Sequence, residues 1–258
     1  MCTRHIWKLL FFVTFCFLVL YLYFALMPAN ITPAALQYFT REEIMMGRKY
    51  WREKELLFVV SFVAQMSVLA VVAFGPGGEV LERWAFNVAR GKKLLGVLLF
   101  FLFLWILLRL VNLPINLYNS YVLEHRWGFS TQTMAGWWVD YVKSAVLDLA
   151  LSVVGTVLLF IALKRWPLNW WLPAGFFMAG WLIIQSFLWP SFVAPLFNRF
   201  EPVQDPEVVA IVENLAQKAN IPLQEVLVMD ASSRTNKANA YFAGIGHTKR
   251  IVLYDNLL

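Results

Sequence analysis

The sequence predicts an α-helical polytopic membrane bundle of about five transmembrane helices, followed by the start of an α/β domain. Hydrophobic residues make up 60% of the 258 residues and charged residues only 15%, against roughly 45–50% and about 25% in soluble domains. Five long apolar stretches occupy the first part of the chain, and the composition becomes mixed after Pro190. We therefore place a membrane-helix domain at residues 1–196 and a second, incomplete domain at residues 197–258.

Each apolar stretch approaches the length of a transmembrane helix, about 20 residues for some 30 Å of hydrocarbon. Backbone groups find no water in the bilayer core, so these stretches must be helical. The first stretch lies where a signal peptide would, but it is long and lacks a small-residue cleavage pattern, which favours a retained span. Trp and Tyr residues gather near the ends of the stretches, as in aromatic belts. The predicted spans lie near residues 6–27, 56–74, 94–111, 145–163 and 171–189.

Charge and cysteine content exclude several other classes of protein. The net charge of +6 is modest, and no basic stripe with interleaved aromatic residues is present, so we expect the lipid bilayer and not nucleic acid as a partner. Cys2 and Cys16 offer neither a disulfide framework nor a zinc cluster. Lys and Arg residues are equally numerous on the two predicted sides of the membrane, so the positive-inside rule gives no orientation.

A few polar residues lie inside or beside the predicted spans, among them Gln65, Arg109, Asp148 and Gln185. Charge inside a membrane is costly and often functional. Arg109 lies near the end of its predicted span, from which its side chain can reach the interface. For Asp148 two interpretations remain open: a structural pairing or interface position, and the lining of a polar cavity.

The residues after the last span predict an amphipathic helix and three strands. Asp205-Pro206 is a good helix start, with Asp as the N-cap and Pro in the first turn, and apolar residues then recur at helical spacing. The predicted helix covers residues 206–220, and the predicted strands lie near residues 225–230, 239–243 and 250–255. The last two strands, joined by a Gly-containing turn, predict a hairpin at the edge of a larger sheet.

Four stretches, in this order, resemble the N-terminal portion of the integral-membrane zinc CAAX prenyl endopeptidases of type I. They are "LPINLYNSYVLEHRWGFS", "WPSFVAPLFNRFEPVQDPE", "VLVMDASSRTNKANAYFAG" and "KRIVLYDNLL". The resemblance implies that residues 197–258 begin a zinc-metallopeptidase domain. It also implies peptide-bond hydrolysis near the C-terminus of a prenylated or membrane-associated protein, in a multi-pass protein of the bacterial inner membrane or an endoplasmic-reticulum-like membrane.

Zinc peptidases of this kind need two His residues one helical turn apart with a Glu between them, plus a further acidic ligand. The histidines of this sequence are His5, His125 and His247, and none lies in an H-E-x-x-H pattern. In the family the zinc helix follows the strand that corresponds to "KRIVLYD". We therefore expect zinc in the complete parent enzyme, no catalytic or metal-ligating residue before Leu258, and no zinc binding or peptide cleavage by this chain alone.

The resemblance places Asn239 and Ala240 of "NAYF" on a strand that pairs with the substrate. An extended peptide that adds to a sheet edge gains main-chain hydrogen bonds whatever its side chains are. Asn239 would add a side-chain hydrogen bond, and the small Ala240 would allow close approach. The alternative from the residues alone is that Asn239 caps a turn while Tyr241 and Phe242 pack in a core.

The segment Glu124-His125-Arg126 and the aromatic residues after it also have two interpretations. They form either a solvated loop anchored at the membrane interface, or a loop that packs against the second domain beside an intramembrane chamber. For the whole chain, the alternative to a protease is a non-catalytic membrane protein that binds substrates or partners. A transporter is a weaker third possibility, because the sequence shows no internal repeat.

Overall fold

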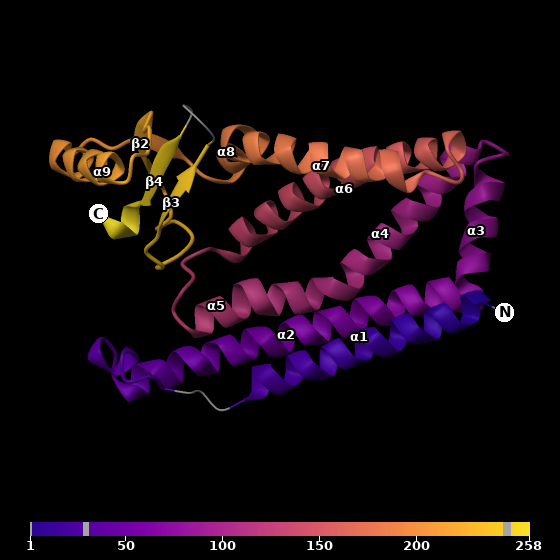
Figure 1. Cartoon of the computed structure of the whole chain (residues 1–258), viewed down its shortest axis with the longest axis horizontal. Helices are drawn as coiled ribbons and strands as arrows, with labels where there is room; N and C mark the ends of the chain where they lie inside the picture. Colours follow the sequence, from indigo (N-terminus) through magenta and orange to yellow (C-terminus); the bar gives the residue numbers. More distant parts are fainter. Residues whose placement is uncertain (1, 28–30, 245–248) are drawn as a thin grey trace.

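The computed structural model describes residues 2–27, 31–244 and 249–258 of the chain. Long helices build most of the molecule, and a small sheet with one covering helix lies at one end (Figure 1). The helices are α1 (Cys2–Leu26), α2 (Arg41–Phe74), α3 (Pro76–Val88), α4 (Lys93–Leu117), α5 (Leu123–Arg126), α6 (Met134–Arg165), α7 (Trp171–Leu188), α8 (Ala194–Phe197) and α9 (Pro206–Lys218). Two π-helical segments, Tyr118–Val122 and Trp189–Val193, link α4 to α5 and α7 to α8.

Among the described residues, three helices are long and apolar enough to cross a membrane: Arg41–Phe74, Lys93–Arg126 and Met134–Arg165. The apolar parts of the other two candidate spans are shorter in the described residues, at Phe12–Leu26 and Trp171–Gln185. The molecule is therefore a helical membrane bundle with three clear spanning helices. The predicted spans near 56–74, 94–111 and 145–163 lie inside these helices, which extend further because their polar flanks are helical too.

The early start of α2 has a local cause that hydropathy does not detect. Thr40 Oγ1 accepts a hydrogen bond from Glu43 N at 3.2 Å, and Glu43 Oε2 accepts one from Thr40 N at 2.8 Å. This reciprocal capping box satisfies two backbone donors that a helix start would otherwise leave free. The helix therefore begins at Arg41, in a polar segment well before the apolar stretch.

Helix α3, at Pro76–Val88, is an element that the sequence analysis did not predict. Gly75 ends α2 and Pro76 occupies the first turn of α3, so the chain turns a corner between two helices. A Cβ atom on Gly96 would lie 2.7 Å from Phe86 Cδ1, which shows how closely α3 and α4 approach. The glycine-rich segment after α2 thus forms the start of an amphipathic helix that packs on α4.

The sheet has four strands in the order β1-β2-β4-β3. They are β1 (Phe200–Pro202), β2 (Glu225–Met229), β3 (Ala240–Ala243) and β4 (Arg250–Tyr254). Strands β2 and β4 are parallel, and β1 and β3 pair antiparallel to their neighbours at the two edges. The hairpin of β3 and β4 has the predicted partners, while residues 245–248 of the turn predicted at 244–249 lie outside the described residues. Strand β1 was missed because three residues that end in proline carry no strand pattern.

Apolar residues cover both faces of the sheet. On one face, Val212 of α9 packs against Val226 and Leu253. On the other face, Leu227 and Val252 are buried together with neighbouring apolar residues. Helix α9 starts as predicted, with Asp205 as its N-cap, because Asp205 Oδ1 accepts a hydrogen bond from Glu207 N at 2.8 Å. The sheet is therefore a packed unit that can hold its edge strand rigidly.

Replacing Leu253 by Ala should destabilise the sheet and α9. The Leu253 side chain is 6% exposed, and Leu→Ala changes in protein cores cost roughly 2–5 kcal/mol. The matched control is Leu215→Ala on α9, where the side chain is 59% exposed and the expected change is within about 0.5 kcal/mol. Limited proteolysis at increasing temperature, monitored by cleavage within the second domain, measures the difference in stability between the two variants. Equal losses in the two variants would contradict this packing.

Candidate functional site

The outer edge of β3 is open. Tyr254 N donates a hydrogen bond to Asn239 O at 2.9 Å, and Ala240 pairs with Leu253 in the register of the two strands. Because main-chain groups of an antiparallel strand point alternately to its two sides, the N–H and C=O groups of Ala240 and Phe242 point away from β4. Within the described residues no strand lies on that side. This edge can therefore accept an extended peptide.

Asn239 lies directly before β3 and is exposed. Its Oδ1 atom accepts a hydrogen bond from Ala240 N at 2.9 Å. One of the outward-pointing amides is thus engaged by a neighbouring side chain, as the turn-cap interpretation requires. Within the described part of the chain, the Nδ2 atom of Asn239 has no partner. Both interpretations of this residue therefore stay open, and they assign its two amide atoms different roles.

The side chains of β3 alternate between a packed and an exposed face. The Tyr241 ring packs against the cluster around Val252, and burial raises the pKa of its phenol. Phe242 is 44% exposed on the opposite face, with the Lys249 ammonium group 5.5 Å from its ring centre. The core role expected of both aromatic residues in the turn-cap interpretation therefore holds for Tyr241 but not for Phe242. Phe242 is placed beside any peptide that pairs with this edge.

The segment from Ala231 to Asn239, here called the linking segment, leads from β2 to β3. Asp255 holds its start: Oδ1 accepts from Ala231 N at 3.0 Å and from Ser232 N at 2.8 Å, and Oδ2 accepts from Ser232 Oγ at 2.5 Å. Burial would raise the pKa of Asp255, but these hydrogen bonds outweigh it, led by those from Ser232, and the pKa lies below its ordinary value. Asn256 Nδ2 holds the middle, donating to Thr235 O at 2.6 Å.

The linking segment is also bonded to the loop between α5 and α6. Thr131 N donates to Arg234 O at 3.1 Å, Asn236 N donates to Phe129 O at 3.1 Å, and Thr235 Oγ1 donates to the same Phe129 oxygen at 2.7 Å. Two segments about a hundred residues apart in the sequence thus form a short main-chain pairing. Of the two interpretations of the loop that follows Glu124, the structure has the one in which it packs against the second domain.

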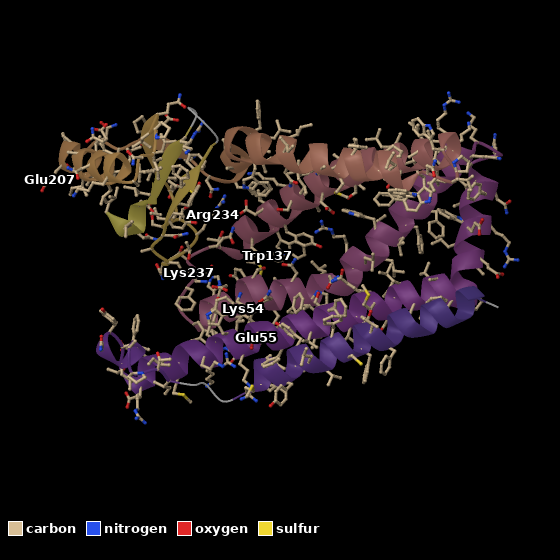
Figure 2. All side chains as sticks on the ribbon, in the orientation of Figure 1. Lys54, Glu55, Trp137, Glu207, Arg234 and Lys237 are labelled. Carbon is tan, nitrogen blue, oxygen red and sulfur yellow. The ribbon has the colours of Figure 1, made fainter. Side chains whose placement is uncertain are left out.

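Glu124 joins three elements through one carboxylate group. It accepts hydrogen bonds from Tyr50 Oη and Lys237 Nζ, each at 2.7 Å, and forms an ion pair with Lys54. Its side chain is 13% exposed. Figure 2 shows Lys54 and Lys237 approaching each other between the helical bundle and the sheet. Tyr50 and Lys54 belong to α2, and Lys237 belongs to the linking segment, so this contact connects the bundle to the segment before β3.

The ammonium group of Lys237 is also placed over aromatic rings. It lies 4.7 Å from the ring centre of Phe129 and 5.3 Å from that of Tyr50. Cation–π contacts of this kind contribute about 0.5–1 kcal/mol at exposed sites. Burial would lower the pKa of Lys237, but the hydrogen bond to Glu124 outweighs it and keeps the pKa above its ordinary value. Lys237 is therefore charged whenever the fold is intact at neutral pH.

Arg234 forms a second contact with the bundle. Its guanidinium group lies 3.3 Å from Asp140 Oδ1 on α6 and donates to Asn198 Oδ1 at 3.0 Å. Gln132 Nε2 in turn donates to Asp140 Oδ2 at 2.6 Å. Neither Arg234 nor Lys237 was singled out by the sequence analysis. Their partners lie far away in the chain, so local sequence patterns could not identify these contacts. Only the family resemblance marked the region, because one of its stretches includes "SSRTNK", which contains both residues.

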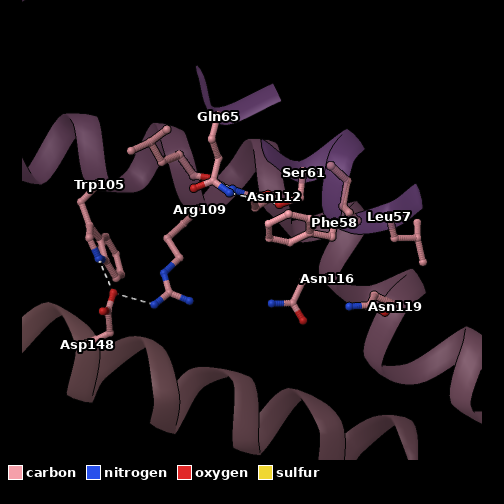
Figure 3. Close-up of a pocket in the computed structure, with 12 residues that line it drawn as sticks. Leu57, Phe58, Ser61, Gln65, Trp105, Arg109, Asn112, Asn116, Asn119 and Asp148 are labelled. Atoms are coloured by element: carbon pink, nitrogen blue, oxygen red, sulfur yellow. Dashed lines mark hydrogen bonds and ion pairs between the residues drawn. The ribbon is translucent and has the colours of Figure 1, made fainter. Parts of the chain in front are cut away.

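A polar cavity of about 490 Å³ opens between α2, α4 and α6 (Figure 3). Between its ends, Ser61 Oγ donates to Asn112 Oδ1 at 2.7 Å. At one end, Asn119 Oδ1 is buried without a hydrogen-bond partner among the described residues, and the main-chain oxygen of this π-helical residue accepts a hydrogen bond from Lys54. The cavity is lined by Leu57, Phe58, Ser61, Gln65, Trp105, Leu108, Arg109, Asn112, Ile115, Asn116, Asn119 and Asp148. Amide side chains thus line a space within the apolar bundle.

Arg109 and Asp148 form an ion pair at this cavity. Arg109 Nη2 lies 2.6 Å from Asp148 Oδ2, and Trp105 Nε1 donates to the same oxygen at 2.8 Å. The Arg109 side chain turns to α6 to make this pair, and α4 continues beyond it to Leu117. For Asp148 the two interpretations turn out to be compatible, since the residue is paired and also lines a polar cavity.

The described residues do not form a zinc site. Within residues 2–27, 31–244 and 249–258, no group of three His, Cys, Asp or Glu side chains could hold a metal ion. His125 Nδ1 lies 2.8 Å from Tyr121 O, in a bond within its own helix turn. His247 lies outside the described residues, and the side chain of His5 is not described.

Comparisons with known proteins give the same family along the chain. A family model described as "CAAX prenyl protease N-terminal, five membrane helices" matches residues 23–199, and the model of peptidase family M48 matches residues 202–258. The CAAX prenyl protease 1 of Saccharomyces cerevisiae is 36% identical over 155 residues, which are 58% of this chain and 33% of the relative. The Arabidopsis thaliana homologue is 31% identical over 229 residues, 85% of this chain and 53% of the relative.

A solved structure shares the fold. The crystal structure of Ste24p from S. mikatae has a TM-score of 0.79 at 27% identity, and the match covers 95% of this chain and 60% of that one. An uncharacterized metalloprotease of Bacillus subtilis is 28% identical over 93% of this chain and 58% of its own length. The chain thus spans between a third and three-fifths of the length of these relatives.

The Arg109–Asp148 pair predicts a non-additive pair of substitutions. Arg109→Met should lower the melting temperature in detergent because it leaves a carboxylate unpaired within the bundle, and Asp148→Asn should do the same for the guanidinium group. The double variant removes both charges and keeps an acceptor for Trp105, so it should melt closer to the wild type than either single variant. A loss equal to the sum of the two single losses would contradict the pairing.

The lowered pKa of Asp255 predicts acid loosening of the linking segment. A carboxylate with a lowered folded-state pKa stabilises the fold fully above its unfolded pKa, about 3.9, and loses this contribution as pH falls through the folded-state value. Hydrogen-exchange protection of the Ser232 amide, corrected for intrinsic rates, should therefore fall in acid. Asp255→Asn should be less protected at neutral pH by about tenfold, since charge-assisted bonds contribute about 1.5 kcal/mol or more. Unchanged protection in this variant, with the Val252 amide as reference, would contradict the anchor.

Proposed function

This chain belongs to the CAAX prenyl protease family of M48 metallopeptidases, and on that premise we propose that it forms the membrane domain and substrate strand of a membrane-embedded zinc endopeptidase. The substrate is the C-terminal region of a prenylated or otherwise membrane-associated protein, as the names of the relatives suggest. The observation that carries the proposal is the open edge of β3, which is anchored against a membrane bundle.

The open edge of β3 has the properties that peptide binding requires. The outward C=O group of Ala240 and both outward groups of Phe242 can pair with an extended chain, while the N–H group of Ala240 is engaged by Asn239 Oδ1. Sheet addition of this kind is a common mode of peptide recognition. Ala240 is exposed and small, so a second backbone can come close. Packing of Tyr241 beneath the strand keeps the edge in place. Ala240 is thus the contact point and Asn239 its neighbour at the start of the strand.

We also assign five membrane crossings to the chain, by α1, α2, α4, α6 and α7. Helix α1 has 25 residues, which at 1.5 Å per residue is long enough for some 30 Å of hydrocarbon. Helix α7 continues through the π-helical segment and α8 to Phe197, so its helical path exceeds its apolar stretch (Figure 1). The division between the membrane and peptidase domains falls at residue 197, near where the two family matches meet.

The family is one of metallopeptidases, which implies zinc in the family. Zinc in such an enzyme polarises the substrate carbonyl and supplies a hydroxide nucleophile. The described residues do not fit a zinc site, so their part in the reaction is to bind and orient the peptide. Holding a peptide in one extended geometry lowers the entropic part of the reaction barrier. The cavity between α2, α4 and α6 provides a further polar space inside the bundle.

Photo-crosslinking to the edge strand tests the proposal directly. A benzoylphenylalanine at position 242 should crosslink to a farnesylated cysteine peptide, whereas the same group at the exposed position 215 of α9 should not. An unlabelled peptide should compete, and its backbone N-methylated counterpart should not, because it cannot form the ladder hydrogen bonds. Equal crosslinking at both positions, or equal competition by the methylated peptide, would refute binding at the strand edge.

Substitutions at Asn239 separate substrate binding from turn capping. If Nδ2 donates to the bound peptide, both Asn239→Ala and Asn239→Asp should weaken peptide binding, by about tenfold for roughly 1.4 kcal/mol. In a complete enzyme the same loss should appear in kcat/KM. If Oδ1 merely caps Ala240 N, Asn239→Asp keeps the acceptor and should bind like the wild type. Full binding by Asn239→Ala would remove this residue from the site.

A further inference from the structure

We infer that Lys237 is a positioning residue: its ion pair with Glu124 fixes edge strand β3 relative to the membrane bundle. This inference rests on the proposed function of β3, because it explains how a peptide on that strand is placed over the bundle. The parts of the contact are the Lys237 ammonium group, the Glu124 carboxylate, the Tyr50 hydroxyl and the Phe129 ring. The family resemblance assigned no role in substrate binding or catalysis to any of these four groups.

The position of Lys237 in the linking segment makes it the last tether before the strand. Main-chain bonds hold Arg234 and Asn236 to the loop between α5 and α6, and these precede Lys237. Asn239 follows two residues later, which is at most about 7 Å of extended chain. Between Lys237 and β3, the described residues make no other hydrogen bond or ion pair with the bundle. The Lys237 side chain is therefore the contact with the bundle that lies nearest to β3 along the chain.

The partner of Lys237 is itself held firmly. Glu124 receives a hydrogen bond from Tyr50 and an ion pair from Lys54, and both belong to α2. Lys54 also donates to Asn119 O at 3.0 Å at the end of the polar cavity. One chain of contacts thus runs from the cavity wall through Lys54 and Glu124 to Lys237. A shift of α2 against α4 would be passed on to the edge strand.

The charges around Glu124 also allow an effect on the position of β3 to be separated from an effect on folding. One carboxylate serves two ammonium groups, so removal of Lys237 leaves Glu124 still paired with Lys54. The loss of one ion-pair partner is strongly destabilising when it leaves a buried charge unpaired. Removal of Lys237 leaves no such charge in the bundle. Removal of Glu124 would instead leave Lys54 and Lys237 facing each other unpaired. Lys237→Met is therefore the informative substitution, since it keeps an apolar stem over the Phe129 and Tyr50 rings.

The experiment compares four proteins: the wild type, Lys237→Met, Lys237→Arg and the matched control Lys218→Met. Arg keeps a cation that can reach the carboxylate, and Lys218 ends α9 on the exposed surface, remote from the bundle contact. Spin labels at Phe242→Cys on β3 and Met46→Cys on α2, with Cys2 and Cys16 replaced by Ser, report the distance between strand and bundle. Melting temperature is measured in parallel, as is the Kd for the farnesylated peptide in the unlabelled proteins.

We expect Lys237→Met to widen the distance distribution at least twofold and to raise the Kd about five- to tenfold, while its melting temperature stays within 2 °C of the wild type. Lys237→Arg and Lys218→Met should match the wild type in all three. An unchanged distribution in Lys237→Met, or a fall in melting temperature that accounts for the weaker binding, overturns the inference. If no variant binds peptide but the distribution widens, the proposed function fails and the positioning role stands.

Discussion

One carboxylate, that of Glu124, connects the helical bundle to the segment that leads into strand β3. It accepts from Tyr50 and Lys54 on one side and from Lys237 on the other. Surface ion pairs usually contribute little to stability. Here the Glu124 side chain is 13% exposed and that of Lys237 43% exposed, and the pair is supported by the hydrogen bonds between Phe129 and the linking segment. Its consequence is geometric: a sheet that could fold against α9 alone is held in one orientation against the helical bundle.

Inside the bundle, too, a charged group depends on its hydrogen-bond and ion-pair partners, and leaving it unpaired there would cost more stability. Asp148 carries a charge among apolar helices, and it persists there because Arg109 and Trp105 both donate to it. Polar groups of α2 and α4 are connected in a similar way, from Gln65 through Ser61 on α2 to Asn112 on α4. Polar groups within a membrane are retained where they pair or face a cavity. The bundle is therefore built around a polar interior that apolar packing alone would not require.

The sequence predicted the features that depend on neighbouring residues. Asp205-Pro206 marked the start of α9, and two short strands joined by a Gly-containing turn marked the hairpin, because a cap and a hairpin each have a local chemical pattern. Helix α3 was missed because its glycine-rich first turn looks like a break. The pairing of Lys237 with Glu124 was out of reach, since the two residues lie 113 positions apart and neither is unusual alone. Asn239 and Ala240 were found only through the family resemblance, and their roles still depend on it.

The short edge strand has a consequence for how such a protein selects substrates. Within the described part of β3, only Ala240 and Phe242 present outward main-chain groups, and Ala240 N is already bonded to Asn239. Three further hydrogen bonds at about 1 kcal/mol each correspond to a Kd in the millimolar range. A brief edge of this kind also resists unwanted pairing with other chains. Confinement of a lipidated substrate to the same bilayer raises its effective concentration enough to offset such weak contacts. A membrane-anchored protease with a weak but well-placed strand can therefore ignore most soluble peptides and still act on anchored ones.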